Sequence, residues 1–313
     1  MTVTRSGSAA LIGRPNAGKS TLINQLLGER LAITSSKPQT TRDRILGVRT
    51  DERMQLVLLD TPGIHKAWTA LNKVMVGKAE AAIHEADVVC WLEDMASVRR
   101  RVREGEPPLD AAADAILTLL EASNRPVILV ANKMDIVQPE VFLPFVDAVR
   151  ERLPKLHSAV PASALTGMGV PDLLEAVFGL LPEGPALYPE EHWTDATERF
   201  LVAEIIREKV FHLTAQEVPY ATYVEIETFD ESERELPGDE AIVRIHAAIA
   251  VERPQQKGIL IGRGGDMIKR IGTLARTDIQ ELLGCRVYLE LFVKVEPDWS
   301  KSPGGVRKAG YKG

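Results

Sequence analysis

The chain has 313 residues, of which 45 % are hydrophobic and 26 % are charged, and its formal net charge is −6. These values are ordinary for a globular protein of about two domains. No apolar run approaches the ~18 residues of a membrane span, and the N-terminus lacks the apolar stretch of a signal peptide. Cys90 and Cys285 are isolated in apolar segments, which excludes a disulfide framework and a cysteine metal site, so we expect a cytoplasmic protein.

The first half of the chain, from Ser8 to about Leu181, alternates near-continuous apolar runs with amphipathic segments. Apolar runs of this kind are typical of strands in a parallel sheet that is buried on both faces. The alternation predicts an α/β fold, with a mostly parallel sheet covered by helices. The expected strands are residues 8–12, 55–59, 86–92 and 126–130, and the expected helices are residues 21–27, 73–84, 109–122, 142–152 and one that begins at Pro171.

Three prolines and a glycine between Leu181 and Glu191 interrupt this alternation and indicate an inter-domain linker. The order of elements then changes to that of a smaller α+β domain. Its expected elements are a helix over residues 199–211, strands over 221–229 and 241–251, an apolar run over 258–261, a helix over 266–283 and a strand over 286–295. We therefore expect domains at 1–182 and 198–296, a linker at 183–197, and a flexible basic tail at 297–313.

Charge is unevenly distributed between these parts. From Glu252 to Gly313 there are 12 Lys or Arg residues against 7 Asp or Glu residues, so the C-terminal part is basic and the rest is acidic. A basic segment on an acidic body indicates an anionic partner, with a chance fluctuation of charge as the alternative.

Residues Gly13–Ser20 fit the phosphate-binding pattern G-x-x-x-x-G-K-S. In such a loop the backbone N–H groups surround the phosphates, the lysine neutralises them and the serine hydroxyl binds Mg²⁺. The loop lies between an expected strand and an expected helix, which places a helix N-terminus against an anion. A chance match in a glycine-rich turn is the alternative. The expected cofactor contacts in this stretch are Gly13, Arg14, Pro15, Asn16, Ala17, Gly18, Lys19, Ser20 and Thr21.

Three further motifs each follow an expected strand, at the place where ligands bind in open α/β sheets. The Asp60 carboxylate can hold Mg²⁺ through a water, and the Gly63 N–H can reach a γ-phosphate. Asp135 can accept two hydrogen bonds from guanine, which adenine cannot supply, and Ser163–Leu165 offers a backbone N–H to the guanine oxygen. Each motif is weak alone, but their order predicts a GTP/GDP site. The expected contacts are Asp60, Thr61, Pro62, Gly63, Ile64, Asn132, Lys133, Met134, Asp135, Ser163, Ala164 and Leu165.

This half of the chain resembles translation-factor-type GTPases of the P-loop class. The resemblance implies that Thr41, within Pro38–Asp43, joins Ser20 and Asp60 as an Mg²⁺ ligand, with Thr40 as the alternative. Switch II would begin at Asp60 and continue to Lys66. The expected catalytic residues are Lys19, Thr41, Asp60 and Gly63.

Ile64 stands where Ras-type GTPases carry a glutamine that orients the attacking water. An aliphatic side chain cannot do this, so we expect slow intrinsic turnover that a partner or a monovalent cation accelerates. Asn16 resembles the phosphate-loop asparagine that binds K⁺ in related GTPases, and a turn-capping role is the alternative.

Residues Ile261–Gly272 contain the second informative motif, Gly262-Arg263-Gly264-Gly265. A G-x-x-G loop between two helices, with a basic residue inside, is the signature of a KH domain, which clamps the backbone of about four single-stranded nucleotides. A glycine-rich helix-turn-helix is the alternative, but the order of the surrounding elements favours a KH domain. The expected RNA-binding residues are Lys257, Gly262, Arg263, Gly264, Gly265, Lys269 and Arg270.

A P-loop GTPase followed by a KH domain resembles the Era family of bacterial ribosome-assembly GTPases, and the resemblance covers nearly the whole chain. It implies a GTP-hydrolysing switch that binds small-subunit (16S) ribosomal RNA near its 3′ end and assists maturation of the small ribosomal subunit. It also implies a monomer that associates loosely with the inner face of the plasma membrane. The alternatives are a GTPase that acts on tRNA modification or the large subunit, and a non-hydrolysing RNA-binding scaffold.

Two stretches depart from the family pattern. Residues 99–103 hold four arginines, for which we expect a basic loop that is either solvated or in contact with RNA. Residues 302–305, Ser-Pro-Gly-Gly, replace a charged stretch of the family.

Overall fold

The computed structural model describes residues 4–35, 37, 40–64 and 69–311 of the chain. These residues form two compact units. The first contains the described residues up to Ile64 together with Asn72–Asp195, and the second contains Thr69–Leu71 and the described residues from Ala196 onward.

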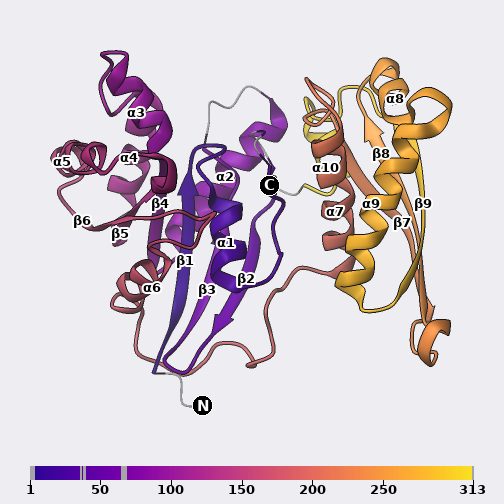
Figure 1. Cartoon of the computed structure of the whole chain (residues 1–313), viewed down its shortest axis with the longest axis horizontal. Coiled ribbons are helices and arrows are strands. Elements are labelled where there is room, and N and C mark those ends of the chain that lie inside the picture. Colours follow the sequence, from indigo (N-terminus) through magenta and orange to yellow (C-terminus); the bar gives the residue numbers. More distant parts are fainter. Residues whose placement is uncertain (1–3, 36, 38–39, 65–68, 312–313) are drawn as a thin grey trace. The chain divides into compact units, whose positions relative to one another are not determined.

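The first unit is built on a six-stranded sheet in the order β2-β3-β1-β4-β5-β6. All neighbouring strands are parallel except β2 and β3, which are antiparallel. The mostly parallel sheet confirms the predicted fold class, whereas β2 is a strand that the sequence analysis missed (Figure 1). The strands are β1 Arg5–Gly13, β2 Ile45–Thr50, β3 Met54–Asp60, β4 Val88–Asp94, β5 Val127–Asn132 and β6 Leu156–Pro161.

Helices connect these strands and cover the sheet. They are α1 Lys19–Leu27, α2 Ala70–Glu85, α3 Met95–Arg103, α4 Ala111–Ser123, α5 Phe142–Arg152 and α6 Val170–Phe178. The expectation of a loop at residues 99–103 was wrong, because these residues end helix α3. Asp94 begins that helix by accepting hydrogen bonds from the N–H groups of Ala96 at 3.0 Å and Ser97 at 3.3 Å, which is a strong N-cap.

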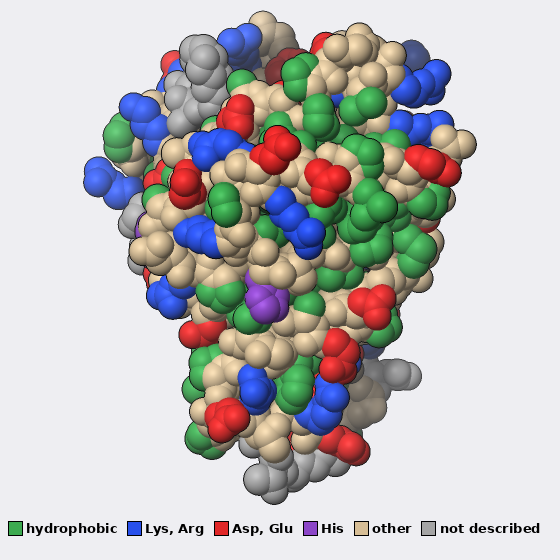
Figure 2. Space-filling model, turned by 90° about the vertical axis from the view of Figure 1, so that its left-hand side faces the viewer, with side chains coloured by type: hydrophobic (Ala, Val, Ile, Leu, Met, Phe, Trp, Pro, Cys, Tyr) green, Lys and Arg blue, Asp and Glu red, His purple; other side chains and the backbone are tan. Residues whose placement is uncertain are grey.

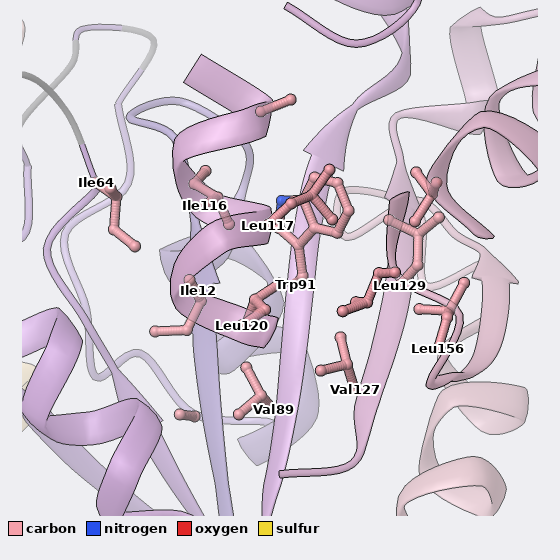
Figure 3. Packing of buried hydrophobic residues seen from close by; sticks show 14 of the residues in the cluster. Ile12, Ile64, Val89, Trp91, Ile116, Leu117, Leu120, Val127, Leu129 and Leu156 are labelled. Carbon is pink, nitrogen blue, oxygen red and sulfur yellow. The ribbon is translucent and has the colours of Figure 1, made fainter. Parts of the chain in front are cut away.

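The core of the first unit explains why its strands read as continuous apolar runs. On one face, Ile12, Val89, Trp91 and Leu129 pack against α4 and its neighbours (Figure 3). The alternate residues of the same strands, such as Leu11, are also fully buried. Both faces of the sheet are therefore covered, as in other parallel sheets.

The segment predicted to be a linker is bonded along the first unit. The backbone N–H of Val48 donates to the Trp193 carbonyl at 2.8 Å, and Gly47 forms an isolated bridge with Thr194. The Gln55 side-chain oxygen accepts hydrogen bonds from the N–H groups of Leu187 at 2.6 Å and Tyr188 at 2.8 Å. These bonds join the segment to β2 and β3 although its prolines rule out a regular element. The first unit therefore ends at Asp195 and not at residue 182.

The second unit has a three-stranded sheet in the order β7-β8-β9, in which β7 and β8 are antiparallel and β8 and β9 are parallel. Its apolar side chains form one core between the sheet and the helices α7 and α9. This is the predicted α+β domain. Its elements are α7 Glu198–Leu213, β7 Tyr223–Glu233, β8 Ile242–Val251, α8 Pro254–Ile261, α9 Asp266–Leu283, β9 Arg286–Val295 and α10 Pro303–Lys308.

The C-terminal tail was predicted to be flexible, and for its described residues this was wrong. Trp299 is only 3 % exposed, and its indole N–H donates to the Ala221 carbonyl at 2.8 Å. Val306 and Tyr311 are buried as well. The Ser-Pro-Gly-Gly stretch forms the start of α10, where the Ser302 hydroxyl caps the helix by accepting from the Gly305 N–H at 3.1 Å. The proline at the first helical position is compatible with this role.

Within the described part of the chain, no helix combines the length and the apolar character needed to cross a bilayer.

Candidate nucleotide site and KH loop

The phosphate loop connects β1 to α1 and surrounds the Lys19 side chain. The Lys19 ammonium is buried and donates to the carbonyls of Gly13 at 3.2 Å and Arg14 at 2.9 Å. Burial, opposed by the charge of Asp60, lowers the pKa of Lys19 to about 8. A buried cation whose hydrogen bonds to described residues go to carbonyls gains stabilisation from an anionic ligand, so this geometry suits phosphate.

Three side-chain oxygens meet beside the loop. The Ser20 and Thr41 hydroxyls lie 2.9 Å apart, and they donate to Oδ2 of Asp60 at 3.1 and 3.0 Å respectively. Burial raises the pKa of Asp60, although Lys19 opposes this shift, and Oδ1 of Asp60 is buried without a hydrogen-bond partner. Oxygen ligands of this kind fit a hard divalent cation, and the orphaned oxygen is the observation that favours one.

This oxygen cluster differs from a carboxylate-rich metal site. Among the described residues, no group of three or more His, Cys, Asp or Glu side chains is placed to hold a metal ion. The structure thus brings together the three residues expected to bind Mg²⁺, and it leaves room for ligands from a bound nucleotide and water.

The start of switch II lies directly against the phosphate loop. The Thr61 hydroxyl donates to the Leu11 carbonyl at 2.7 Å, and the Ile64 N–H donates to the Gly13 carbonyl at 3.0 Å. A Cβ atom on Gly63 would lie less than 3.0 Å from the backbone of Pro15, so only glycine permits this approach. The expected switch residues Pro38, Gln39, His65 and Lys66 lie outside the described residues.

Ile64 points into the core of the first unit. Its side chain is 8 % exposed and belongs to the same apolar cluster as Ile12 and Ile116 (Figure 3). The residue in the place of the water-orienting glutamine is therefore both apolar and turned away from the nucleotide cavity.

The base-binding end of the site is braced through Asn132. Its Nδ2 donates to the Ala17 carbonyl at 2.7 Å, and its Oδ1 accepts from the Ala164 N–H at 2.8 Å. The Lys133 ammonium donates to Oδ2 of Asp94 at 2.8 Å. The phosphate loop, the Asn132–Asp135 motif and the Ser163–Leu165 motif are therefore held together by one side chain.

A cavity of about 800 Å³ extends along these motifs. Of the residues expected at the nucleotide, it is lined by Arg14, Pro15, Asn16, Gly18, Lys19, Ser20, Thr21, Thr41, Gly63, Asn132, Lys133, Asp135, Ser163, Ala164 and Leu165. The expected contacts Gly13, Ala17, Asp60, Thr61, Pro62, Ile64 and Met134 lie behind this lining and do not form part of it. The volume is in the range of small-molecule sites.

The cavity also has walls that sequence reasoning did not find. They are Ile33, Thr34, Ser35, Glu93, Asp94, Ser97 and Ile136, and Thr40, the alternative to Thr41, lines the cavity as well. Glu93 and Asp94 end β4 at the same edge of the sheet as the other motifs. Their position after an apolar run was a signal that could have identified them.

Glu93 lies at the centre of a charge network. Its fully buried carboxylate lies 3.4 Å from Nε of Arg14 and 3.7 Å from Nη2 of Arg101. Burial, opposed by these two arginines, raises the pKa of Glu93 to about 7. Asp110 completes the network by accepting from Nη1 of Arg14 at 2.7 Å, and although burial opposes the shift, this bond lowers the pKa of Asp110 to about 2. Arg14 of the phosphate loop is thereby fixed to α3 and α4.

The predicted KH loop has the expected backbone. Gly262, Gly264 and Gly265 have φ values of 73°, 63° and 88°, in the left-handed region that favours glycine. A Cβ atom on Gly262 would lie 2.7 Å from Cβ of Met267. The loop therefore turns tightly between α8 and α9, with Arg263 exposed at the turn.

Basic side chains surround this loop. Arg263, Lys269 and Arg270 are exposed and Lys257 is half-buried. Counting only described residues, none of the four makes an ion pair. Unpaired cations beside a backbone turn can contact phosphates without first breaking another bond.

Comparisons with known proteins agree with this geometry. Residues 8–133 match the family described as 50S ribosome-binding GTPase, and residues 217–300 match the KH domain family. GTPase Era of Geobacter metallireducens is 47 % identical over 307 residues, covering 98 % of this chain and 98 % of the relative. The chain belongs to the Era family of GTPases. GTPase Era of Leuconostoc citreum is 43 % identical over 308 residues, covering 98 % of this chain and 96 % of that relative.

Two solved Era structures share the whole fold. Era in complex with MgGDPNP and nucleotides 1506–1542 of 16S ribosomal RNA has a TM-score of 0.89 and 38 % identity, covering 98 % of this chain and 99 % of that one. An Aquifex aeolicus Era variant bound to GDP·AlF₄⁻ has a TM-score of 0.87 and 39 % identity, with the same coverage. The predictions of a P-loop GTPase, of GTP hydrolysis and of a C-terminal KH domain are thus confirmed.

Proposed function

We propose that this Era-family GTPase is a GTP/GDP switch whose KH domain holds the 3′ region of 16S ribosomal RNA during maturation of the small ribosomal subunit. The observation that carries the proposal is the presence, in one chain, of a braced guanine-nucleotide cavity and a G-x-x-G loop with unpaired cations. The solved relative that carries both MgGDPNP and the 3′ nucleotides of 16S ribosomal RNA supports it.

The test is RNA binding in defined nucleotide states. A labelled 3′ fragment of 16S ribosomal RNA is titrated with the full chain in GDP and in a non-hydrolysable GTP analogue, beside an unrelated RNA of equal length. We expect preference for the 3′ fragment and a difference between the two states. Equal binding of both RNAs in both states would contradict the proposal.

The RNA contacts are proposed to be Lys257, Arg263, Lys269 and Arg270, with the backbone of Gly262, Gly264 and Gly265. Substituting Arg263 and Lys269 by alanine removes two phosphate contacts, so the slope of log affinity against log salt should fall by about 1.4. The double substitution Arg150→Ala with Arg307→Ala, at positions also exposed but outside the loop, is the charge-matched control. GDP affinity should stay unchanged in both variants, since neither touches the nucleotide cavity.

We assign the Mg²⁺ that accompanies the nucleotide to Ser20, Thr41 and Asp60. When bound there, Mg²⁺ neutralises charge that develops on the transferred phosphoryl group. Ser20→Ala should weaken the Mg²⁺-dependent part of GDP binding by about 1–3 kcal/mol, because it removes one oxygen ligand. Thr41→Ala should weaken it in the same way, because the Thr41 hydroxyl contacts Ser20 and Asp60, and Thr40→Ala tests the alternative ligand.

The catalytic residues are proposed to be Lys19, Thr41, Asp60 and Gly63. Lys19 would counter charge on the phosphates, and the Gly63 N–H would donate to the γ-phosphate. Since Ile64 supplies no polar group, intrinsic turnover should be slow. Single-turnover hydrolysis without the 3′ RNA fragment measures the intrinsic rate, and the same experiment with the fragment measures whether RNA accelerates it.

K⁺ is the monovalent cation that we propose to accelerate hydrolysis, with Asn16 as its ligand. Asn16 has a φ of 65° and lines the cavity, so it would lie beside the phosphates of a bound nucleotide. Hydrolysis should be faster in KCl than in NaCl, and Asn16→Ala should remove the difference. Equal rates in both salts for the unchanged chain would reject K⁺.

The family resemblance also motivates a proposal on state and location: a cytoplasmic monomer that contacts the inner face of the plasma membrane peripherally. Sedimentation equilibrium tests the monomer. Co-flotation with vesicles of anionic lipid, compared with neutral lipid, tests the membrane contact.

A further inference from the structure

Three arginines of α3 are not accounted for by the GTPase site or by the KH loop. Arg100 and Arg103 lie in the last turn of this helix, where cations are favourable, and Arg99 directly precedes them. Arg100 and Arg103 are exposed, and Arg99 is half-buried with a long hydrogen bond of 3.4 Å to the Ile136 carbonyl. In the part of the chain that the structure describes, none of the three makes an ion pair.

The fourth arginine of the cluster, Arg101, differs from these three because it is buried and ion-paired. It pairs with Glu93 and Asp110, and it donates from Nη2 to the Pro108 carbonyl at 2.8 Å. One side of α3 thus fastens the helix to the unit, and the other side carries the unpaired guanidinium groups. Along the face formed by α3, α4 and α5, basic and acidic side chains alternate over most of the surface (Figure 2). On α3, by contrast, three arginines without ion pairs to described residues lie together.

The unpaired arginines line an open cavity of about 390 Å³. Its other lining residues are Ala96 and Glu104. Arg99 and Arg103 are four residues apart, and Arg100 and Arg103 are three apart, so the helix brings the three side chains to one side. Ala96, one turn earlier, is small and leaves space between them.

We propose that this α3 arginine pocket, formed by Ala96, Arg99, Arg100, Arg103 and Glu104, binds phosphodiester groups of RNA without reading sequence. A guanidinium presents a planar fork of donors that matches phosphate oxygens, and it is held by fewer waters than an ammonium. Among the described lining residues there is no aromatic side chain, so a base could stack only on the guanidinium planes, which do not distinguish one base from another. The choice of RNA rests on the proposed function, which brings RNA to this chain.

The pocket is held rigid by the nucleotide site. Asp94 caps α3 and also accepts the hydrogen bond of Lys133, while Arg101 is joined through Glu93 to Arg14 of the phosphate loop. Binding phosphate would therefore order only side chains, not backbone. This lowers the entropic cost that weakens contacts made by loose basic segments.

The test is a charge-matched pair of full-length variants. In the first, Arg99, Arg100 and Arg103 are all changed to Gln. In the control, Lys73, Arg150 and Arg307 are changed to Gln. These three are also exposed and, among described residues, also lack ion pairs. Both variants lose three positive charges, so any difference between them reports the location of the charges.

Affinity for the 3′ RNA fragment is measured between about 50 and 200 mM salt. At about 50 mM salt the α3 variant should bind the fragment at least about tenfold more weakly than the unchanged chain. Its slope of log affinity against log salt should be smaller by about 2, as expected for the loss of three single-strand phosphate contacts. The control should stay close to the unchanged chain. The arginine side chains of residues 99–103 should gain protection from modification by phenylglyoxal when RNA is added.

Two results would overturn the inference. One is equal RNA affinity and slope for the two variants. The other is protection of residues 99–103 from phenylglyoxal by a poly-glutamate peptide but not by RNA, which would make the pocket a site for acidic protein segments. The Arg263→Ala and Lys269→Ala variant separates this outcome from failure of the proposed function. If that variant loses RNA binding while the α3 variant keeps it, only the α3 pocket is rejected.

Discussion

The amide of Asn132 occupies the space that a side chain on Gly18 would need. A Cβ atom at Gly18 would lie less than 3.0 Å from Nδ2 of Asn132, and that nitrogen donates to the Ala17 carbonyl at 2.7 Å. The phosphate loop and the base-binding strand end are therefore in direct contact. Their contact sets the distance between the phosphate and base ends of the cavity.

Gly18→Ala should break this contact. We expect GDP affinity to fall by at least about tenfold, because the Asn132 amide must move and the backbone at Gly18 has a φ of 100°. Gly28→Ala is the matched control, since Gly28 also has a positive φ, 74°, but has nothing within 4 Å of its Cβ position. Gly28→Ala should cost about 1 kcal/mol of stability and leave GDP binding intact. Titration with a fluorescent GDP analogue compares them.

Asp135→Asn should change which base is bound. The carboxylate is replaced by an amide that cannot accept both guanine hydrogen bonds, so affinity for GTP should fall by about 2–4 kcal/mol while that for XTP rises. Asp172→Asn, an exposed substitution on α6, should have no effect. Unchanged GTP affinity in Asp135→Asn would show that another group reads the base.

The lowered pKa of Lys19 predicts a pH dependence of stability. In the nucleotide-free folded state this pKa is about 8 against an ordinary 10.5, so the folded chain binds fewer protons than the unfolded chain between these values. Its free energy of unfolding should therefore rise with pH across this window, by roughly 2–3 kcal/mol from this group. Urea unfolding of Lys19→Met should lack the rise. Parallel curves for both proteins would contradict the assignment.

Glu93 predicts a dependence of the opposite sign at lower pH. Its folded-state pKa of about 7 exceeds the ordinary 4.5, so the protonated form is favoured by folding. The associated stability is fully present below about pH 4.5 and is lost as pH rises through 7. Between pH 5 and pH 8 the free energy of unfolding of the unchanged chain should fall by about 1–3 kcal/mol relative to that of Glu93→Gln. A constant difference between the two would show that Arg14 and Arg101 keep this carboxylate ionised throughout.

Trp299→Ala should destabilise the second unit. The substitution removes a buried indole and leaves the Ala221 carbonyl without its partner, which should cost about 3–5 kcal/mol. Lys301→Ala, two residues later and exposed, should change stability by less than about 0.5 kcal/mol. Hydrogen exchange of β7 and β8 amides locates the effect in this unit.

Residue patterns predicted the motif loops because their conformations are local. A lysine and glycines at fixed spacing between a strand and a helix define the phosphate loop, and three left-handed glycines define the KH turn. Parallel strands also place their carboxyl ends at one edge of the sheet, so the sequence alone predicted that Asp60, Asn132 and Ser163 lie near one another.

The misses share a different physical cause, since each segment is held by contacts with other elements that its own residue pattern does not show. Residues 99–103 looked like a solvated loop because the partner of Arg101 is Glu93 on a preceding strand. The tail looked mobile because of its Ser-Pro-Gly-Gly stretch, whereas the structure shows that the Trp299 indole donates to the Ala221 carbonyl. Strand β2 was missed because Gly47 and Arg49 interrupt its apolar pattern. Its hydrogen bonds to β3, and not its own residue pattern, hold it in the sheet.

The hydrogen bond from Val48 to Trp193 has a practical consequence for the isolated GTPase unit. Strand β2 is the outermost strand of its sheet, and the connecting segment shields its open side at Gly47 and Val48. A fragment cut after residue 182 would present that side unshielded, and bare strand edges recruit strands of other molecules. Such a fragment should self-associate during purification. A fragment that ends at Asp195 retains the segment that is hydrogen-bonded to the edge of β2, so it should stay monomeric.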